Sequence, residues 1–325
     1  MLSSKIKYCL NEIKKNWRDR LWWKNRFIHY VIKKYYKIKG NDGCYVYSID
    51  NWDNLLILDA CRYDSFIKIL NIKKCKYIIT RGTETPEFLK ENFTNKYFND
   101  IVYVTANPWV DIICKKSFYK IISVWKYRWD EELGTVHPWD MVVEAIKARK
   151  KYPDKKLIVH FLQPHNPYLF NNIINRLSYD AQNPRKNPTG IILTKPFKAV
   201  ERGIIPVNKL YEAYLENLKI VLIYAIYLAR KLKGRTIITS DHGEAFGEKL
   251  HPLIPIRIYG HPSSVRIPVL VKVPWYTVDN KLFDNFIDVK HLKKQIIYLN
   301  NKIKNKNKSE EKLIKDNIKR LKHKF

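Results

Sequence analysis

Residues 236–248 read TIITSDHGEAFGE, and no other stretch of the chain says more about the fold. Its first four residues are all β-branched, which predicts a short buried strand that ends at Ser240. In an open α/β sheet, ligands bind in the crevice outside the carboxyl ends of the strands. Asp241 and His242 follow the strand directly and offer one oxygen and one nitrogen donor to a divalent cation. The stretch therefore predicts a metal site at the edge of a parallel sheet.

From residue 45 onward, short apolar runs alternate with amphipathic segments. This alternation predicts an α/β fold with a doubly wound, mostly parallel sheet and helices on both faces. The expected strands are 44–47, 55–58, 77–80, 101–105, 157–162, 236–239 and 269–273. The expected helices are 65–70, 86–92, 140–151 and 208–233. The stretch 171–206, rich in Asn, Pro and Gly, is expected to form a long excursion over the site.

The charge of the chain is extreme and concentrated at its two ends. The formal net charge is +30 over 325 residues. Residues 1–44 hold 12 Lys or Arg against 3 Asp or Glu, and residues 290–325 hold 13 against 3. An anionic membrane, acidic substrates or nucleic acid would each explain this charge, and so would a chain-wide bias toward Lys, Ile, Asn and Tyr. No nucleic-acid-binding module is recognisable, so nucleic acid is not an expected partner.

The N-terminal residues 5–39 mix aromatic side chains with Lys and Arg. Ile13, Trp17, Leu21 and Ile28 lie near helical spacing, which predicts a helix with one apolar and one cationic face. Helices of this type lie in the interface of anionic membranes. The alternative is a terminal helix that packs across the main domain. We expect a helical segment over 1–44, a main domain over 45–285 and basic helices over 286–325.

The five cysteines form no CxxC pair, which predicts reduced thiols in an intracellular compartment. The N-terminus is basic, but no apolar h-region follows it, so no signal peptide is expected. No stretch is long and apolar enough to predict a transmembrane helix. A cytoplasmic protein, at most peripheral on the membrane, is the expectation.

A second strand is expected to end in a carboxylate. Residues 54–64 read NLLILDACRYD, so Asp59 should lie at the same sheet edge as Asp241. Arg62 is expected to pair with a carboxylate, or else to meet an anionic substrate. His165 and His261 lie in turns next to strands, whereas the mid-strand position of His160 favours a structural role.

The sequence Thr85-Pro86-Glu87 is typical of a helix start, with Thr85 as the capping residue. A hydroxyl at this place lies near free backbone N–H groups and the positive end of the helix dipole, a location that suits an anion. A metal ion beside it, held by Asp59 and Asp241, would instead make Thr85 a nucleophile.

Taken in order, these segments resemble the alkaline phosphatase superfamily and its sulfatase-like branch. That branch includes arylsulfatases, lipoteichoic acid synthase and lipid A phosphoethanolamine transferases. The matching pieces are LILDACRYD, RGTETPEF, HFLQPHNPY, LYEAYLENLKIVL, TIITSDHGEAFGE and GHPSSVRIPVLVKVP. The resemblance implies an alkaline-phosphatase-like catalytic domain over 45–285 and one divalent metal ion, which could be Zn, Mn, Mg or Ca.

The resemblance also implies roles for individual residues. The implied metal ligands are Asp59, Thr85, Asp241 and His242. Thr85, or else Thr83, matches the nucleophile. His165 and His261 match the histidines that bind the anionic oxygens of the substrate or protonate the leaving group. Glu84 stands two residues before Pro86, where formylglycine-forming sulfatases need Cys or Ser.

The expected function is a metal-dependent phosphoester hydrolase or phospho-group transferase with a threonine nucleophile. Its substrate would be an anionic ester, either lipid-linked or glycan-linked. One alternative is a sulfuric ester hydrolase without formylglycine. The other is a non-catalytic basic protein on the same fold that binds membranes or nucleic acid.

Overall fold

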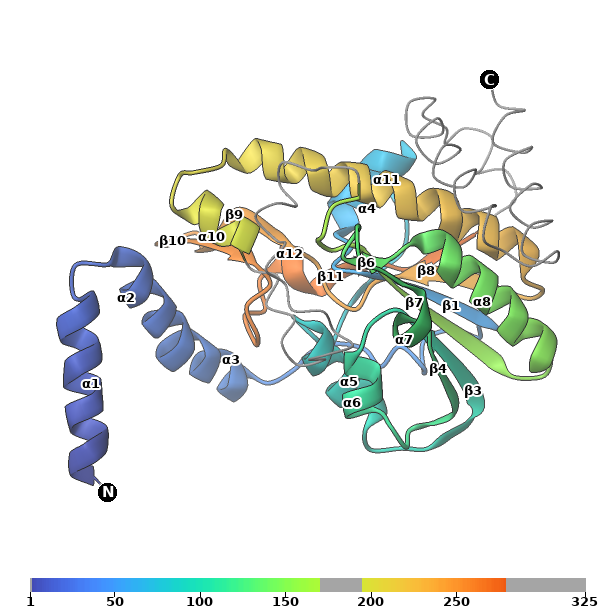
Figure 1. Ribbon diagram of the computed structural model, residues 1–325, viewed down its shortest axis with the longest axis horizontal. Helices are drawn as coiled ribbons and strands as arrows, with labels where there is room; N and C mark the ends of the chain where they lie inside the picture. The colour runs from blue at the N-terminus through green and yellow to red at the C-terminus, as the bar shows by residue number, and fades with distance from the viewer. Residues whose placement is uncertain (1, 170–194, 279–325) are drawn as a thin grey trace.

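The computed structural model describes residues 2–169 and 195–278 (Figure 1). Its centre is a six-stranded sheet with the strand order β12-β8-β1-β7-β3-β4. Five of these strands run parallel, and β12 pairs antiparallel with β8. The bounds are β1 Asn54–Asp59, β3 Phe98–Thr105, β4 Phe118–Ser123, β7 Lys156–Pro164, β8 Thr236–Thr239 and β12 Tyr276–Thr277. The predicted mostly parallel sheet is confirmed.

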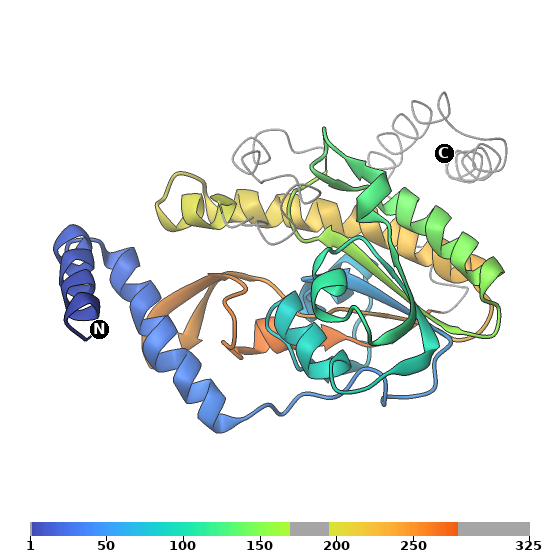
Figure 2. The same ribbon diagram turned by 60° about the horizontal axis from the view of Figure 1, so that its bottom comes forward.

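Helices cover both faces of this sheet (Figure 2). One face packs against α4 (Tyr63–Leu70), α8 (Pro138–Lys151) and α11 (Val207–Lys231), and the other against α5 (Thr85–Phe93) and α6 (Trp109–Ile113). Strand β1 shows why two layers are needed. Leu56 and Leu58 pack in the core cluster beneath α8 and α11, whereas Leu55 and Ile57 pack in the cluster that contains Phe88. Successive side chains of a strand point to opposite faces, so an entirely apolar strand needs cover on both.

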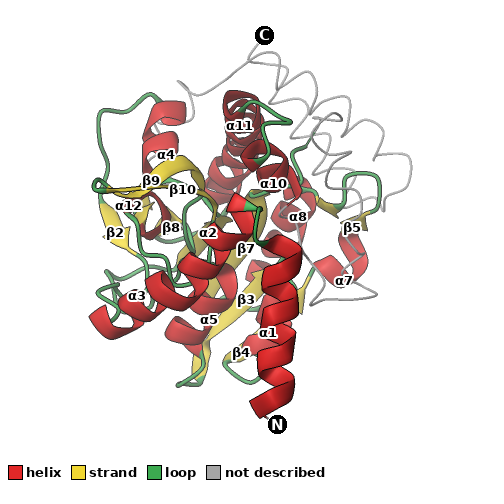
Figure 3. Ribbon diagram, turned by 90° about the vertical axis from the view of Figure 1, so that its left-hand side faces the viewer, coloured by secondary structure: helices red, strands yellow, loops and turns green. Residues whose placement is uncertain are grey.

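Smaller elements surround the central sheet. Three two-stranded antiparallel sheets are formed by β2 (Tyr77–Ile79) with β11 (Lys272–Pro274), β5 (Trp129–Asp130) with β6 (Thr135–Val136), and β9 (Ala245–His251) with β10 (Ile254–Gly260). The remaining short helices are α7 (Trp125–Arg128), α10 (Lys195–Glu201) and α12 (Pro268–Val271). The N-terminal helices are α1 (Leu2–Asn16), α2 (Arg20–Phe27), the π-helix η1 (Ile28–Ile32) and α3 (Lys33–Lys39), which Figure 3 shows in front of the sheet.

Two predicted strands are wrong. In the segment 44–47, Cys44 forms only an isolated bridge with Thr80, because the N–H of Val46 donates to the side chain of Asn92 and the chain then turns, with the N–H of Ser48 bound to the carbonyl oxygen of Tyr45. In the segment 269–273, Pro268 opens the helical turn α12, and only the last two residues belong to β11.

The strand predicted at 77–80 exists as β2, but it lies outside the central sheet. The structure describes only residues 195–206 of the predicted excursion 171–206, and these include α10. The helices predicted for 286–325 lie outside the described residues. None of the helices that the structure describes has the length and apolar character needed to cross a bilayer.

One glycine fixes how the loop between β8 and β9 packs on α12. The N–H of Gly243 donates to the carbonyl oxygen of Leu270 at 2.8 Å, and a Cβ on Gly243 would lie 1.9 Å from the carbonyl oxygen of Val269. Both neighbours are backbone atoms, so neither moves without displacing the chain. We expect Gly243→Ala to lower the free energy of unfolding by about 3 kcal/mol, as overpacking in a rigid environment does.

Urea denaturation measures this loss, with Gly203→Ala as the matched control. Gly203 has φ 71° but no atom near its Cβ position, so its substitution costs only the left-handed conformation, about 1 kcal/mol. Equal losses in the two variants would contradict the packing described for Gly243.

Candidate active site

Two buried carboxylates meet where neighbouring strands end. Asp59 is the last residue of β1, and Asp241 lies two residues beyond the end of β8. Because β1 and β8 are parallel neighbours, both chains leave the sheet at the same edge. The hydroxyl of Ser240 donates to the carbonyl oxygen of Leu58 at 2.6 Å, and the N–H of Ala60 donates to Asp241 Oδ1 at 3.1 Å. These bonds hold the two strand ends, and with them the two carboxylates, in one place.

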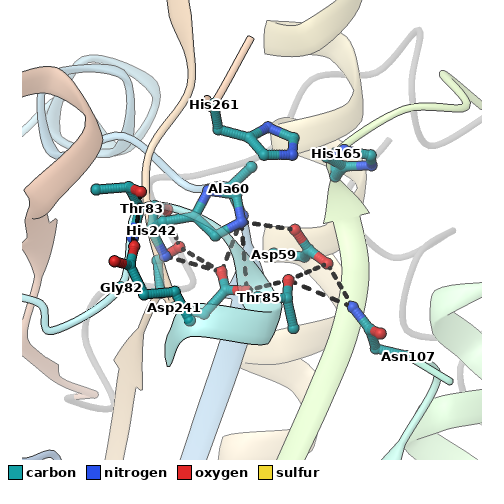
Figure 4. A network of polar contacts seen from close by, with 12 residues as sticks. Asp59, Ala60, Gly82, Thr83, Thr85, Asn107, His165, Asp241, His242 and His261 are labelled. Carbon is teal, nitrogen blue, oxygen red and sulfur yellow. Dashed lines mark hydrogen bonds and ion pairs between the residues drawn. The ribbon is translucent and has the colours of Figure 1, made fainter. Parts of the chain in front are cut away.

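Thr85 points its hydroxyl at these carboxylates (Figure 4). Its Oγ1 donates to Asp241 Oδ2 at 2.6 Å and lies 3.4 Å from Asp59 Oδ2. The N-cap residue of α5 is the extended Glu84, and Thr85 is the first helical residue. The interpretation of Thr85 as the capping residue is therefore wrong. Its hydroxyl faces the site, at the N-terminal end of a helix.

Thr83 is placed differently. Its hydroxyl donates to Glu87 Oε2 at 2.7 Å and accepts the N–H of Ser264 at 2.7 Å. These contacts tie the start of α5 to the loop that follows β10. Of the two threonines that the sequence left as candidate nucleophiles, the geometry favours Thr85.

His242 presents a free nitrogen to the same space. Its Nδ1 lies 2.8 Å from the carbonyl oxygen of Gly243, which places the proton on Nδ1 and leaves the lone pair on Nε2. This Nε2 lies 3.6 Å from Asp59 Oδ1 and 3.5 Å from Asp241 Oδ2. Within the described chain, His242 Nε2 and Asp59 Oδ1 are buried atoms without a hydrogen-bond partner. Buried polar atoms of this kind need an explanation, and a cation between them supplies one.

The electrostatics of the site also fit a cation. Burial, followed by the nearby charge of Asp241, raises the pKa of Asp59 well above its ordinary value. Burial opposes ionisation of Asp241 too, but His242 and His160 lower its pKa. Burial also lowers the pKa of His242 and so favours its neutral, metal-binding form. Two carboxylates, a hydroxyl and a neutral imidazole form a donor set that suits a small divalent metal ion.

His165 and His261 lie beside this set. The ring centroid of His261 lies 4.5 Å from that of His242 and 5.0 Å from that of His165. His261 Nδ1 lies 2.7 Å from Oε1 of the fully buried Glu244. Burial opposes protonation of both histidines and lowers the pKa of His165 to about 4. For His261, the carboxylate of Glu244 outweighs burial and raises the pKa above its ordinary value.

Three site residues were not predicted from the sequence. Asn107, which follows the carboxyl end of β3, donates from Nδ2 to Asp59 Oδ2 at 2.9 Å. Glu244 belongs to the SDHGE stretch, but its pairing with His261 was not foreseen. His160, expected to be structural, lies with Nε2 3.7 Å from Asp241 Oδ2. Of these three, only Asn107 could have been predicted from the sequence. It follows a strand, and the rule that site residues lie beyond the carboxyl ends of parallel strands, used for Asp59, applies to it as well.

Arg62 is engaged elsewhere. Its guanidinium forms ion pairs with Asp64 at 2.6 Å and with Glu248 at 2.5 Å, and it is buried. The carboxylate pairing favoured for Arg62 is thus observed, and substrate binding is not supported, because its charge already has two partners.

A cavity of about 470 Å³ lies over the site. Its wall includes the site residues Asp59, Thr85, Asn107, His165 and His261. Other parts of the wall come from the N-terminal helices and from α10, the described part of the predicted excursion. The lysines in this wall are Lys33, Lys198 and Lys24, of which Lys24 forms an ion pair with Glu201, another wall residue. The cavity therefore has room for a ligand and cationic groups that suit an anion.

Comparison with known proteins gives a structural likeness but no match in sequence. No model of a known protein family matches the chain, and no curated protein matches it. Among solved structures, the chain is similar to the C-terminal periplasmic domain of EcEptC from Escherichia coli, determined in complex with Zn. The sequence identity is 12%, the TM-score is 0.37, and the match covers 76% of this chain and 78% of that one. The architecture described above is mixed α/β, with a mostly parallel central sheet flanked by helices.

The close approach of the two carboxylates predicts that Asp59→Asn is more stable than the wild type without metal and less stable than the wild type with metal. Because burial raises the pKa of Asp59, its folded form favours the proton, and stability is lost as the pH rises through that pKa. In EDTA at pH 7, we expect Asp59→Asn to raise the melting temperature by about 3 °C, the shift that about 1 kcal/mol produces in a chain of this size. Excess Mn²⁺ or Zn²⁺ should stabilise the wild type, by about 2.7 kcal/mol at one hundred times Kd, and the variant far less.

Thermal unfolding with and without metal measures both effects. The control is Asp100→Asn, since Asp100 is half exposed and pairs only loosely with Lys156, at 3.7 Å. Equal stabilisation of wild type and Asp59→Asn by metal would show that Asp59 is not a ligand.

Proposed function

We propose that this chain is a metal-dependent phosphoester hydrolase or phospho-group transferase of the sulfatase-like branch of the alkaline phosphatase superfamily, with Thr85 as its nucleophile. The observation that carries the proposal is the hydroxyl of Thr85 at the start of α5, 2.6 Å from Asp241 Oδ2 and beside two buried donor atoms without partners. A threonine with only a structural role would not need two buried carboxylates and an imidazole nitrogen around its hydroxyl.

The residues that would hold the metal are Asp59, Thr85, Asp241 and His242. A bound divalent ion (Zn, Mn, Mg or Ca) would lower the cost of ionising a hydroxyl and offset negative charge on a phosphoryl group. The ion would also lower the raised pKa of Asp59, because its positive charge offsets the cost of keeping two buried carboxylates ionised at close range.

The chain itself supplies the nucleophile and positions the phosphoryl group. Asp241 Oδ2 accepts the hydrogen bond of Thr85 and is therefore the nearest acceptor for its proton. Attack by Thr85 Oγ1 forms a new P–O bond and breaks the bond to the leaving group, which leaves a phosphothreonine. Asn107 Nδ2, 3.5 Å from Thr85 Oγ1, and the positive end of the α5 dipole stabilise the phosphoryl oxygens.

The histidines serve the leaving group. Glu244 raises the pKa of His261 and keeps a proton available at this imidazole, which can pass to the departing oxygen. His165, whose pKa lies near 4, is neutral at pH 7, and its Nδ1 lies 2.7 Å from the carbonyl oxygen of Asn166, which places the proton on Nδ1. Its Nε2 therefore accepts hydrogen bonds and can receive one from the attacking water or acceptor hydroxyl. Water or an acceptor hydroxyl then attacks the phosphothreonine and releases Thr85, giving hydrolysis or transfer. Lysines in the cavity wall suit an anionic ester, lipid-linked or glycan-linked.

Turnover of nitrophenyl esters tests this assignment. With Mn²⁺, Zn²⁺ or Ca²⁺ present, we expect cleavage of phosphate monoesters or diesters. Thr85→Ala should lower kcat by about a thousandfold or more, since the nucleophile is lost, and Thr85→Ser should retain part of the activity. The matched control is Thr83→Ala, which removes a hydroxyl two residues away and should leave most of the activity.

The other outcomes identify the alternatives. Cleavage of nitrophenyl sulfate alone would replace the proposal by a sulfuric ester hydrolase without formylglycine. Full activity in Thr85→Ala would contradict the assignment of the nucleophile. A wild type that binds metal but cleaves none of these esters, and phosphorylates no lipid or glycan acceptor, would favour a non-catalytic binding protein.

The pair of Glu244 and His261 predicts a particular pH dependence. Glu244 raises the pKa of His261, so removal of its charge should lower that pKa. If protonated His261 is the acid, the alkaline limb of the kcat/KM profile for Glu244→Gln should move to lower pH, by about one unit. An unmoved alkaline limb, with kcat/KM lowered equally at every pH, would indicate that Glu244 only supports the loop.

A further inference from the structure

The N-terminal helices carry most of the exposed apolar surface of the described chain. Twenty large hydrophobic residues are exposed, and eleven of them belong to residues 6–38. These eleven are Ile6, Tyr8, Leu10, Ile13, Trp17, Trp23, Phe27, Tyr30, Val31, Tyr35 and Ile38. Monomeric soluble proteins rarely expose so much apolar surface in one place, and such patches mark interaction sites.

Only one face of these helices packs against the body of the protein. Ile28 and Ile32 are buried, and with Tyr36 they join the core cluster of β9 and β10 through residues such as Leu250 and Ile258. Helix α1 stands away from the sheet in Figures 1 and 2, and none of its residues from 6 onward is buried. The inner face of η1, with Tyr36 of α3, therefore anchors the segment, while α1 contributes nothing to the core of the described chain.

The exposed residues of α1 form a stripe that continues beyond the helix. Ile6, Leu10, Ile13 and Trp17 are spaced by four, three and four residues, which places them on one helical face. Their exposed fractions are 54%, 54%, 38% and 58%. A regular apolar stripe on a helix is typical of a face that packs against another surface. No part of the described chain covers this stripe.

The charge around the stripe identifies the partner. Residues 6–39 contain eleven Lys or Arg and only two acidic residues, Glu12 and Asp19. Both acidic groups are engaged: Glu12 lies 3.7 Å from Arg26, and Asp19 Oδ1 accepts the N–H of Leu21 at 2.8 Å. A second copy of the chain would bring the same positive charge, and nucleic-acid phosphates would make no use of an aliphatic stripe. An apolar layer beneath an anionic surface satisfies both features.

We propose that the outer face of α1–α3 docks on an anionic phospholipid surface. The aliphatic stripe and the Trp17 ring enter the interface, while Lys and Arg meet the lipid phosphates. Lys24, Ile28 and Lys33 also line the cavity over Asp59 and Thr85, so docking brings that cavity to the headgroup layer. The docking itself does not depend on catalysis. Only its consequence, access to esters in the headgroup layer, rests on the proposed function.

Vesicle sedimentation with the full chain tests the proposal. We expect the wild type to sediment with vesicles of phosphatidylcholine and phosphatidylglycerol but not with phosphatidylcholine alone. Binding should weaken when NaCl rises from about 0.1 M to about 1 M, because the screening length falls from about 10 Å to about 3 Å. The variant Leu10→Ser/Ile13→Ser/Trp17→Ser should bind at least about tenfold more weakly, since it loses the apolar insertion.

Two controls separate docking from folding and from catalysis. Ile204→Ser/Leu253→Ser removes apolar residues that are 67% and 86% exposed outside the segment, and should bind as the wild type does. Thr85→Ala should also bind normally, so failed catalysis and failed docking are distinguishable. The melting temperature of the α1 variant should match that of the wild type.

Four results would overturn the proposal. The first is that the wild type does not bind anionic vesicles, and the second is that the wild type and the α1 variant bind them equally. The third is that the wild type binds neutral and anionic vesicles equally. The fourth is that the wild type forms a dimer in solution, which the α1 variant does not form, and binds no vesicles. Binding of duplex DNA in preference to anionic vesicles would likewise replace the membrane by nucleic acid.

Discussion

The approach of two carboxylates, Asp59 and Asp241, is the constraint on which the site depends. Parallel pairing of β1 with β8 delivers both residues to the same edge, and hydrogen bonds from Ser240 and Ala60 keep them there. Burial, followed by their mutual repulsion, raises the pKa of Asp59 and costs stability unless a cation lies between them. The metal-free fold is thus less stable for holding this donor set, as the proposed metal site requires.

The remaining site residues are arranged around these carboxylates in two groups. Thr85 and Asn107 contact them directly, from the start of α5 and the end of β3. His261 and His165 lie on the side of the cavity, with Glu244 behind His261. The proposed nucleophile and the proposed proton donor therefore come from different elements that line the same cavity. The N-terminal helices complete the wall, so the proposed chemistry and the proposed membrane surface adjoin.

The sequence was sufficient for residues whose role follows from local position. Asp59 and Asp241 end apolar strands, and the rule that parallel strands end at one edge placed them together. It was insufficient where a contact depends on distant packing. Thr85 could not be separated from Thr83 until the contacts of Thr83 with the loop at Ser264 were seen. Likewise, the strand predicted at 44–47 failed because the N–H of Val46 donates to the side chain of the distant Asn92, which local propensity does not reveal.

The central claim is that Thr85 accepts a phosphoryl group. The most direct measurement is acid quenching of the metal-loaded protein during turnover of a nitrophenyl phosphate ester, followed by peptide mass spectrometry. The account predicts one phosphoryl group on Thr85 in the wild type and none in Asp241→Ala, which lacks both a proposed metal ligand and the proposed proton acceptor. Continued turnover with Thr85 unmodified, or a phosphoryl group on Thr83 or another residue instead, would contradict it.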